Sequence, residues 1–125
     1  MTENSRSSGG NEVAPVLERS YQFVLWLVPT VEKFPRSQKF LLGDRLQSHA
    51  YGILEDLTEA TYDRNRVPIL RRVNMRLQKM RIMFRIATDL KHLDRRRYEF
   101  AARSIDEIGR LVGGWIRADD AAKIR

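Results

Sequence analysis

Basic side chains with few acidic neighbours are the residues of this sequence that point most clearly to ligand binding. Twelve of the twenty-three Lys and Arg residues lie between Arg64 and Arg97, a segment with only two acids, Asp89 and Asp94. The formal charge of this segment, +10, exceeds the +7 of the whole chain. A surface with so many unneutralised cations attracts polyanions, so the composition predicts a nucleic-acid partner.

Patterns typical of catalytic or metal sites are absent from the sequence. There is no Cys, and the two histidines, His49 and His92, have no second ligand at metal-binding spacing. No Gly-rich phosphate loop or serine nucleophile motif is found. The adjacent carboxylates Glu55-Asp56 and Asp106-Glu107 would point about 100° apart on a helix, too far to act as an acid and base pair. We therefore expect no enzyme activity, no metal and no cofactor.

Apolar residues recur every three to four positions through most of the chain, which is the spacing of helices that bury one face. Phe34-Pro35, the turn around Asp63 and Arg66, and Asp94 as an N-cap separate four such stripes. The pattern predicts helices at about 13–33, 36–62, 68–93 and 95–118. Short connections force neighbouring helices to run in opposite directions, so the fold class is all-α, an antiparallel up-down four-helix bundle.

The predicted core is one stripe from each helix. These stripes are Leu17, Tyr21, Val24, Val28 and Val31, widened by Phe23, Trp26 and Leu27; Leu42, Leu46, Ala50, Ile53, Leu57 and Ala60; Leu70, Val73, Leu77, Met80, Phe84 and Ala87; and Tyr98, Ala101, Ile105, Ile108, Val112 and Trp115. Pro29 should kink or break the first helix. Gly109 and Gly113, one turn apart, should let the fourth helix approach a neighbour closely.

The length of 125 residues fits one domain. The polar composition of residues 1–12 predicts a disordered tail, residues 13–118 form the bundle, and residues 119–125 form a C-terminal tail. No secretory signal is present, and no apolar run approaches the roughly 20 residues that cross a bilayer. We expect a cytoplasmic protein with no membrane partner.

Two groups of basic residues follow from the predicted helices. On 68–93, a solvent-facing sector holds Arg71, Gln78, Arg81 and Arg85, with Arg72, Arg76 and Lys79 on its flanks. Arg81 and Arg85, one turn apart, are the tightest pair. Alternating helix directions also bring two connections to one end of the bundle, where Lys33, Arg36 and Lys39 should lie near Lys91, Arg95, Arg96 and Arg97. Cations at a helix N-terminus are disfavoured by the helix dipole, and a bound anion would offset that cost.

A second apolar stripe lies away from the predicted core. Met75, Ile82 and Ile86 face nearly opposite to the core of 68–93, and Phe40 and Tyr51 face away from the core of 36–62. A monomeric bundle does not need such a surface. The sequence therefore predicts a closed, ring-shaped homo-oligomer with these five residues at the interface, and periodicity alone leaves the number of subunits open.

Three segments resemble the accessory variability determinant (Avd) family of diversity-generating retroelements. They are Pro35 to Leu46 (PRSQKFLLGDRL), Arg81 to Arg85 (RIMFR) and Ile108 to Ile116 (IGRLVGGWI), within a similarity that extends from about Leu17 to Ile116. The resemblance implies a bacterial or phage-encoded, positively charged four-helix bundle that assembles as a pentameric barrel.

The resemblance also implies partners. It points to a non-catalytic subunit that binds nucleic acid, RNA or DNA, and the reverse transcriptase during mutagenic retrohoming, when a template RNA is copied with adenine-directed errors. The paired basic residues of the family's third helix correspond to Arg81 and Arg85. The alternative is an oligomeric basic scaffold of the wider four-helix-bundle family, whose surface binds an acidic protein partner.

Overall fold

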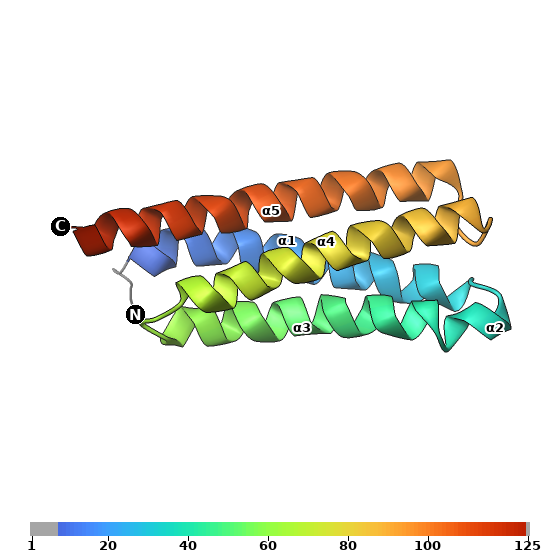
Figure 1. Cartoon of the computed structure of the whole chain (residues 1–125), viewed down its shortest axis with the longest axis horizontal. Helices are drawn as coiled ribbons and strands as arrows, with labels where there is room; N and C mark the ends of the chain where they lie inside the picture. Colours follow the sequence, from blue (N-terminus) through green and yellow to red (C-terminus); the bar gives the residue numbers. More distant parts are fainter. Residues whose placement is uncertain (1–7, 125) are drawn as a thin grey trace.

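The computed structural model of the protein describes the backbone of residues 8–124 and the side chains of residues 13–123. The helices are α1 (Ser8–Glu32), α2 (Arg36–Lys39), α3 (Leu42–Tyr62), α4 (Val67–Asp89) and α5 (Arg95–Ile124). Four of them are long, α2 is a single turn, and no strand occurs in the described range (Figure 1). The prediction of an all-α protein is confirmed. None of the described helices has an apolar stretch that would cross a membrane.

The long helices enclose one core. Helix α1 contacts α3 and α5, and α4 contacts the same two helices, so α1 and α4 lie diagonally across the bundle. In Figure 1, α2 and the α4–α5 connection lie at one end of the long axis. The α3–α4 connection, the start of α1 and the end of α5 lie at the other end.

The core stripes of α3, α4 and α5 are largely those that the sequence predicts. All six predicted positions of α4 are buried, as are five of the six on α3 and on α5, with Leu42 and Tyr98 only partly buried. In α1 the stripe is rotated: Val16, Phe23, Leu27 and Val31 point inward, whereas Tyr21 is half-exposed. Apolar residues dominate 21–28, so their periodicity does not select one face, and packing against α3 and α5 decides it.

Several helix boundaries differ from the prediction. The predicted helix 36–62 is divided at Phe40 and Leu41 into α2 and α3, and α4 ends at Asp89 rather than at 93. Helix α1 begins at Ser8, so it includes part of the predicted N-terminal tail, while residues 1–7 lie outside the described residues. Helix α5 continues to Ile124, through most of the predicted C-terminal tail. There the buried carboxylate of Asp119 lies 3.6 Å from Arg66 and 3.2 Å from Lys123.

The structure shows neither a break at Pro29 nor the predicted close approach at Gly109 and Gly113. Helix α1 is not interrupted at Pro29, which is exposed, so the carbonyl left without an N–H partner lies on the solvent side. A Cβ at Gly109 would meet only Leu77, at an ordinary 3.8 Å, and one at Gly113 would meet Arg117 of its own helix. Close approach occurs on α3 instead, where a Cβ at Gly43 would collide with Val31 of α1.

The end of α4 is closed by a residue in the left-handed conformation. Lys91 has φ of 68°. Its N–H donates to the carbonyl of Thr88, and the N–H of His92 donates to that of Ala87 at 2.8 Å, the hydrogen-bond pattern of a Schellman cap. Glycine is the usual residue at this position, because a Cβ crowds the backbone there.

Lys91→Gly should therefore stabilise the protein by about 1 kcal/mol, by relieving backbone strain at positive φ. Urea denaturation monitored by circular dichroism measures this difference in unfolding free energy. Lys91→Ala is the matched control, because it removes the same charge but keeps a Cβ. Equal stabilisation by both variants would show that charge repulsion, not backbone strain, is relieved.

Candidate nucleic-acid interface

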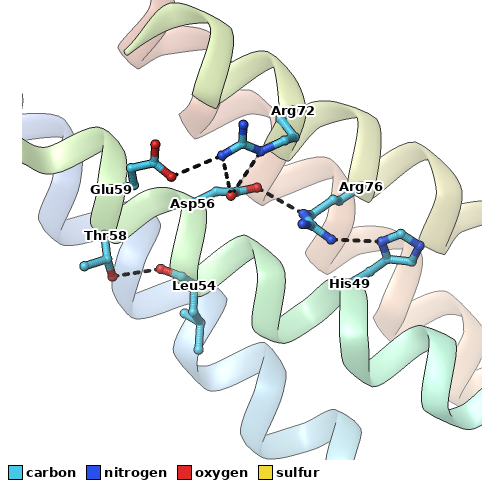
Figure 2. A network of polar contacts seen from close by, with 7 residues as sticks. All are labelled: His49, Leu54, Asp56, Thr58, Glu59, Arg72 and Arg76. Carbon is cyan, nitrogen blue, oxygen red and sulfur yellow. Dashed lines mark hydrogen bonds and ion pairs between the residues drawn. The ribbon is translucent and has the colours of Figure 1, made fainter. Parts of the chain in front are cut away.

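Two arginines of α4 share a buried carboxylate of α3, and one of them, Arg72, also pairs with Glu59 at 3.2 Å. The side chain of Asp56 is 7% exposed. Arg72 donates to its Oδ1 from Nε at 3.1 Å and from Nη2 at 2.8 Å, and Arg76 Nε donates to Oδ2 at 3.0 Å (Figure 2). The hydrogen bonds that Arg72 donates to Asp56, and then the charge of Asp56, raise the pKa of Arg72. Arg72 and Arg76, predicted to flank a polyanion site, instead join α4 to α3.

Gly52 and His49 complete this network. A Cβ at Gly52 would collide with the guanidinium of Arg76, so the absence of a side chain lets this arginine reach across α3. Arg76 Nη1 lies 3.4 Å from Nδ1 of His49 (Figure 2). Burial lowers the pKa of His49, and the charges of Arg76, Lys79 and Arg45 lower it further. Because a guanidinium only donates, a neutral imidazole that accepts at Nδ1 fits this contact.

The remaining basic residues predicted on α4 differ in their surroundings. Arg81 Nη2 donates to Asp106 Oδ1 of α5 at 2.7 Å, so its charge is largely matched. Arg71, Lys79 and Arg85 are exposed and have no carboxylate at ion-pairing distance among the described residues. Arg81 and Arg85 are therefore not an equivalent pair. Arg85 instead lines an α4–α5 cleft of about 280 Å³ together with Arg95.

The basic end of the bundle, defined as Lys33, Arg36, Lys39, Lys91, Arg95, Arg96 and Arg97, comes from the two connections at that end (Figure 1). The rings of Phe34 and His92 lie 6.2 Å apart and join these connections. Lys39 pairs with Glu32 and Arg97 with Asp94. The other five cations are exposed and lack a carboxylate at ion-pairing distance within the described part of the chain.

The predicted N-cap of α5 is confirmed at this end. The N–H of Arg97 donates to Asp94 Oδ1 at 2.8 Å. This bond, with the charges of Arg97 and Arg96, lowers the pKa of Asp94, so the cap stays ionised. The carboxylate of Asp94 forms an ion pair only with Arg97. Among the described residues, Arg95 and Arg96 have no carboxylate at ion-pairing distance, although they lie in the first turn of α5.

A cleft between α1 and α5 was not predicted from the sequence. The aromatic cleft, as we name it, has a volume of about 490 Å³ and is lined by Trp26, Asp94, Arg96, Arg97, Phe100 and Arg103. The sequence placed Trp26 in a core stripe, and Phe100 and Arg103 belonged to no predicted stripe. Periodicity carried no signal for this site, because its residues come from helices about 70 positions apart.

The five predicted interface residues are all exposed, with Ile82 at 62%, but they do not form one surface. Met75, Ile82 and Ile86 follow the outward face of α4. Tyr51 lies seven residues, or two turns, before Thr58, which lines a groove between α1 and α3. The exposed Tyr21 and the partly buried Leu54 line the same groove. The α3–α4 ion pairs lie on the other side of α3.

No group of three or more His, Cys, Asp or Glu that could hold a metal ion occurs among the described residues.

Comparison with known proteins identifies a relationship over most of the chain: residues 16–118 match a family model described as bAvd-like. The resemblance to the Avd family is thereby confirmed. No curated protein and no solved structure shows a significant match.

The His49 contact predicts a dependence of stability on pH. A lowered pKa in the folded protein means that the unfolded chain protonates first, near its ordinary value of about 6.5. Folding stability should therefore fall as the pH drops from 6.5 toward the folded-state pKa. Between pH 7.5 and 5.5 the melting temperature of the wild type should fall further than that of His49→Gln.

His92→Gln is the matched control and should keep the wild-type decrease. An identical decrease in His49→Gln would exclude His49 as its source.

Proposed function

The chain belongs to the bAvd-like family, and from this premise we propose that it is a non-catalytic accessory protein of a diversity-generating retroelement. In this role it binds nucleic acid, as template RNA or cDNA, together with the reverse transcriptase in the cytoplasm. The observation that carries the proposal is the basic end, where five exposed cations lack a carboxylate at ion-pairing distance among the described residues.

The position of these cations favours a phosphate ligand. Arg95 and Arg96 occupy the first turn of α5, where the helix dipole disfavours positive charge by about 0.3 to 1 kcal/mol per residue. A phosphate placed there meets both side-chain cations and the unpaired N–H groups of the first turn. Phosphate contacts of this kind give affinity without reading sequence, which suits a protein that accompanies a polymerase along its template.

Arg85 extends this surface along α4. It lines the α4–α5 cleft with Arg95, beside the acids Asp89 and Glu99. Because neither arginine has a carboxylate at ion-pairing distance among the described residues, a strand at the basic end can continue toward the middle of the bundle. Arg81 lies on the same side, paired with Asp106. We propose that Arg81 and Arg85, together with the basic end, serve nucleic acid and reverse transcriptase, as the family resemblance implies for these two residues.

The ring-shaped oligomer is the second part of the proposal, and two different faces of the bundle support it. The α4 stripe of Met75, Ile82 and Ile86 is flanked by Arg71 and Lys79. The α1–α3 groove is lined by Leu17, Tyr21 and Leu54 together with the acid Glu18. The same two helices also carry exposed Leu25 and Tyr51 and the exposed acids Asp44 and Glu55. A basic apolar stripe is complementary to an acidic apolar groove.

Two complementary but different faces produce head-to-tail association, which closes into a ring when the rotation per subunit fits. The family resemblance implies five subunits. Phe40 lies at the α2 end of the groove helices and is 62% exposed, which suits a contact at the same junction. Such a ring would repeat the basic end once per subunit around one rim and so increase avidity for a single strand.

The basic end can be tested through the salt dependence of RNA binding. Arg95→Gln/Arg96→Gln should weaken binding and reduce the slope of log affinity against log salt by about 0.7 for each single-strand phosphate that the variant no longer neutralises. Arg64→Gln/Arg117→Gln removes two exposed cations away from the basic end and should leave the slope unchanged. Fluorescence anisotropy of a labelled RNA gives both quantities.

An equal decrease in the two double variants would mean that only net charge matters. Absence of RNA binding by the wild type even at low salt would favour the alternative, a scaffold that binds an acidic protein partner.

The association of subunits can be tested by light scattering. Wild type should have a mass several times 14.7 kDa, and Ile82→Glu should reduce it to that of one chain, because a carboxylate would be buried in an apolar contact. Ala121→Glu introduces the same group at an exposed position of α5 and should keep the oligomer.

A charge exchange tests the pairing of the two faces. Lys79→Glu should weaken association, and adding Glu55→Lys should restore it. A wild-type mass near 14.7 kDa at micromolar concentration would contradict the ring itself.

A further inference from the structure

The aromatic cleft between α1 and α5 combines an exposed ring, Phe100, and a partly buried one, Trp26, with cations that have no carboxylate at ion-pairing distance among the described residues. We propose that it is a stacking site for an unpaired base of single-stranded nucleic acid. The inference rests on the proposed nucleic-acid function and adds to it a preference for single strands and a defined contact residue, Phe100.

The rings of the cleft are held in place by the core. Phe100 is 39% exposed, and its ring centroid lies 4.8 Å from that of Trp26. Trp26 stacks in turn on buried Phe23, with centroids 5.7 Å apart and planes 12° apart, and lies 6.2 Å from buried Phe84. This aromatic column reaches from the core to the surface. A base that stacks on its outer end therefore meets a rigid platform and needs little side-chain ordering.

The charges around the rings suit a phosphate backbone. Arg96, Arg97 and Arg103 line the cleft, with Asp94 as the one acid among its lining residues. Asp94 is already engaged by the side chain and the backbone N–H of Arg97. Arg96 and Arg103 have no carboxylate at ion-pairing distance among the described residues, so two cations remain beside the rings.

The size and position of the cleft favour a single strand over a duplex or a free nucleotide. Its volume of about 490 Å³ falls in the range of about 300 to 1,000 Å³ that holds small ligands. A base within a duplex is stacked on its neighbours and cannot enter without unpairing. Arg96 and Arg97 belong to both the cleft and the basic end, so the phosphates that flank an inserted base can continue onto Lys91 and Arg95. Aromatic platforms beside a positive surface are how single-strand binding proteins hold successive bases.

The two tryptophans make the proposal directly observable. Trp26 lines the cleft, whereas Trp115 is fully buried. A base that stacks at the cleft should quench the fluorescence of Trp26 and leave that of Trp115 unchanged. The probes are a 20-nucleotide oligouridylate, a duplex RNA of the same length, uridine monophosphate and inorganic polyphosphate, each titrated into the full-length protein.

We expect oligouridylate to quench the fluorescence and polyphosphate to compete for binding without quenching, because polyphosphate has no bases. The duplex should bind without quenching, and the mononucleotide should quench only at far higher concentration, because it lacks the flanking phosphates. Equal quenching by polyphosphate, or none by oligouridylate, would overturn the proposal.

Substitutions at Phe100 provide the second measurement. Phe100→Leu keeps an apolar side chain but removes the ring, and should weaken oligouridylate binding by about 5- to 150-fold, the range typical of removing one base stack. Phe100→Tyr should retain binding. Tyr62→Leu is the matched control, since it removes an exposed ring at the end of α3, remote from the cleft, and should have no effect.

The salt dependence of binding distinguishes the stacking site from the nucleic-acid function on which it rests. Phe100→Leu should lower affinity with the salt slope unchanged, whereas Arg103→Gln should lower both. If wild type binds RNA with a steep salt slope but Phe100→Leu binds as tightly, the stacking site is wrong and the nucleic-acid function stands. If wild type binds no RNA, both are wrong.

Discussion

The buried carboxylate of Asp56 is the constraint on which the arrangement of surfaces depends. Removing a carboxylate from water costs several kcal/mol, and here hydrogen bonds from Arg72 and Arg76 to both of its oxygens offset that cost. These hydrogen bonds form only when α4 has one rotation about its own axis and one position along the axis of α3. Gly52 leaves the space that Arg76 occupies. Once that rotation is set, Met75 and Ile82 must face outward.

The distribution of charge follows from the same packing. A basic segment in the sequence suggests a helix that is evenly basic along its surface. In the fold, some of these cations form ion pairs with carboxylates of neighbouring helices and others do not. Arg72, Arg76 and Arg81 meet carboxylates of neighbouring helices and stabilise the bundle. Within the described part of the chain, Arg36, Lys91, Arg95 and Arg96 meet none, and they gather where two connections adjoin. Unpaired positive charge is therefore densest at this end of the bundle, and on α4 it is reduced to Arg71, Lys79 and Arg85.

In the proposed function, three tasks fall on different faces of the bundle. Association is assigned to the apolar stripe and groove, phosphate contacts to the basic end, and base stacking to the aromatic cleft beside that end. None of these proposed tasks requires a catalytic group. The proximity of Trp26 and Phe100 to the core aromatics shows how a binding surface can be stiffened by the same residues that stabilise the fold.

The sequence alone determined the features that depend on neighbours within one helix. Periodicity identified most of the buried positions of α3, α4 and α5, and Asp94 as the cap of α5, because a stripe or a cap is a local property. Only the tertiary structure decided which face of α1 is buried, where α4 ends, and which arginines are neutralised. The partners of Arg72, Arg76 and Arg81 lie 16, 20 and 25 positions away, and the two rings of the aromatic cleft lie on different helices. Such pairings depend on the rotation and height of each helix in the bundle, which hydrophobic spacing within one helix does not encode.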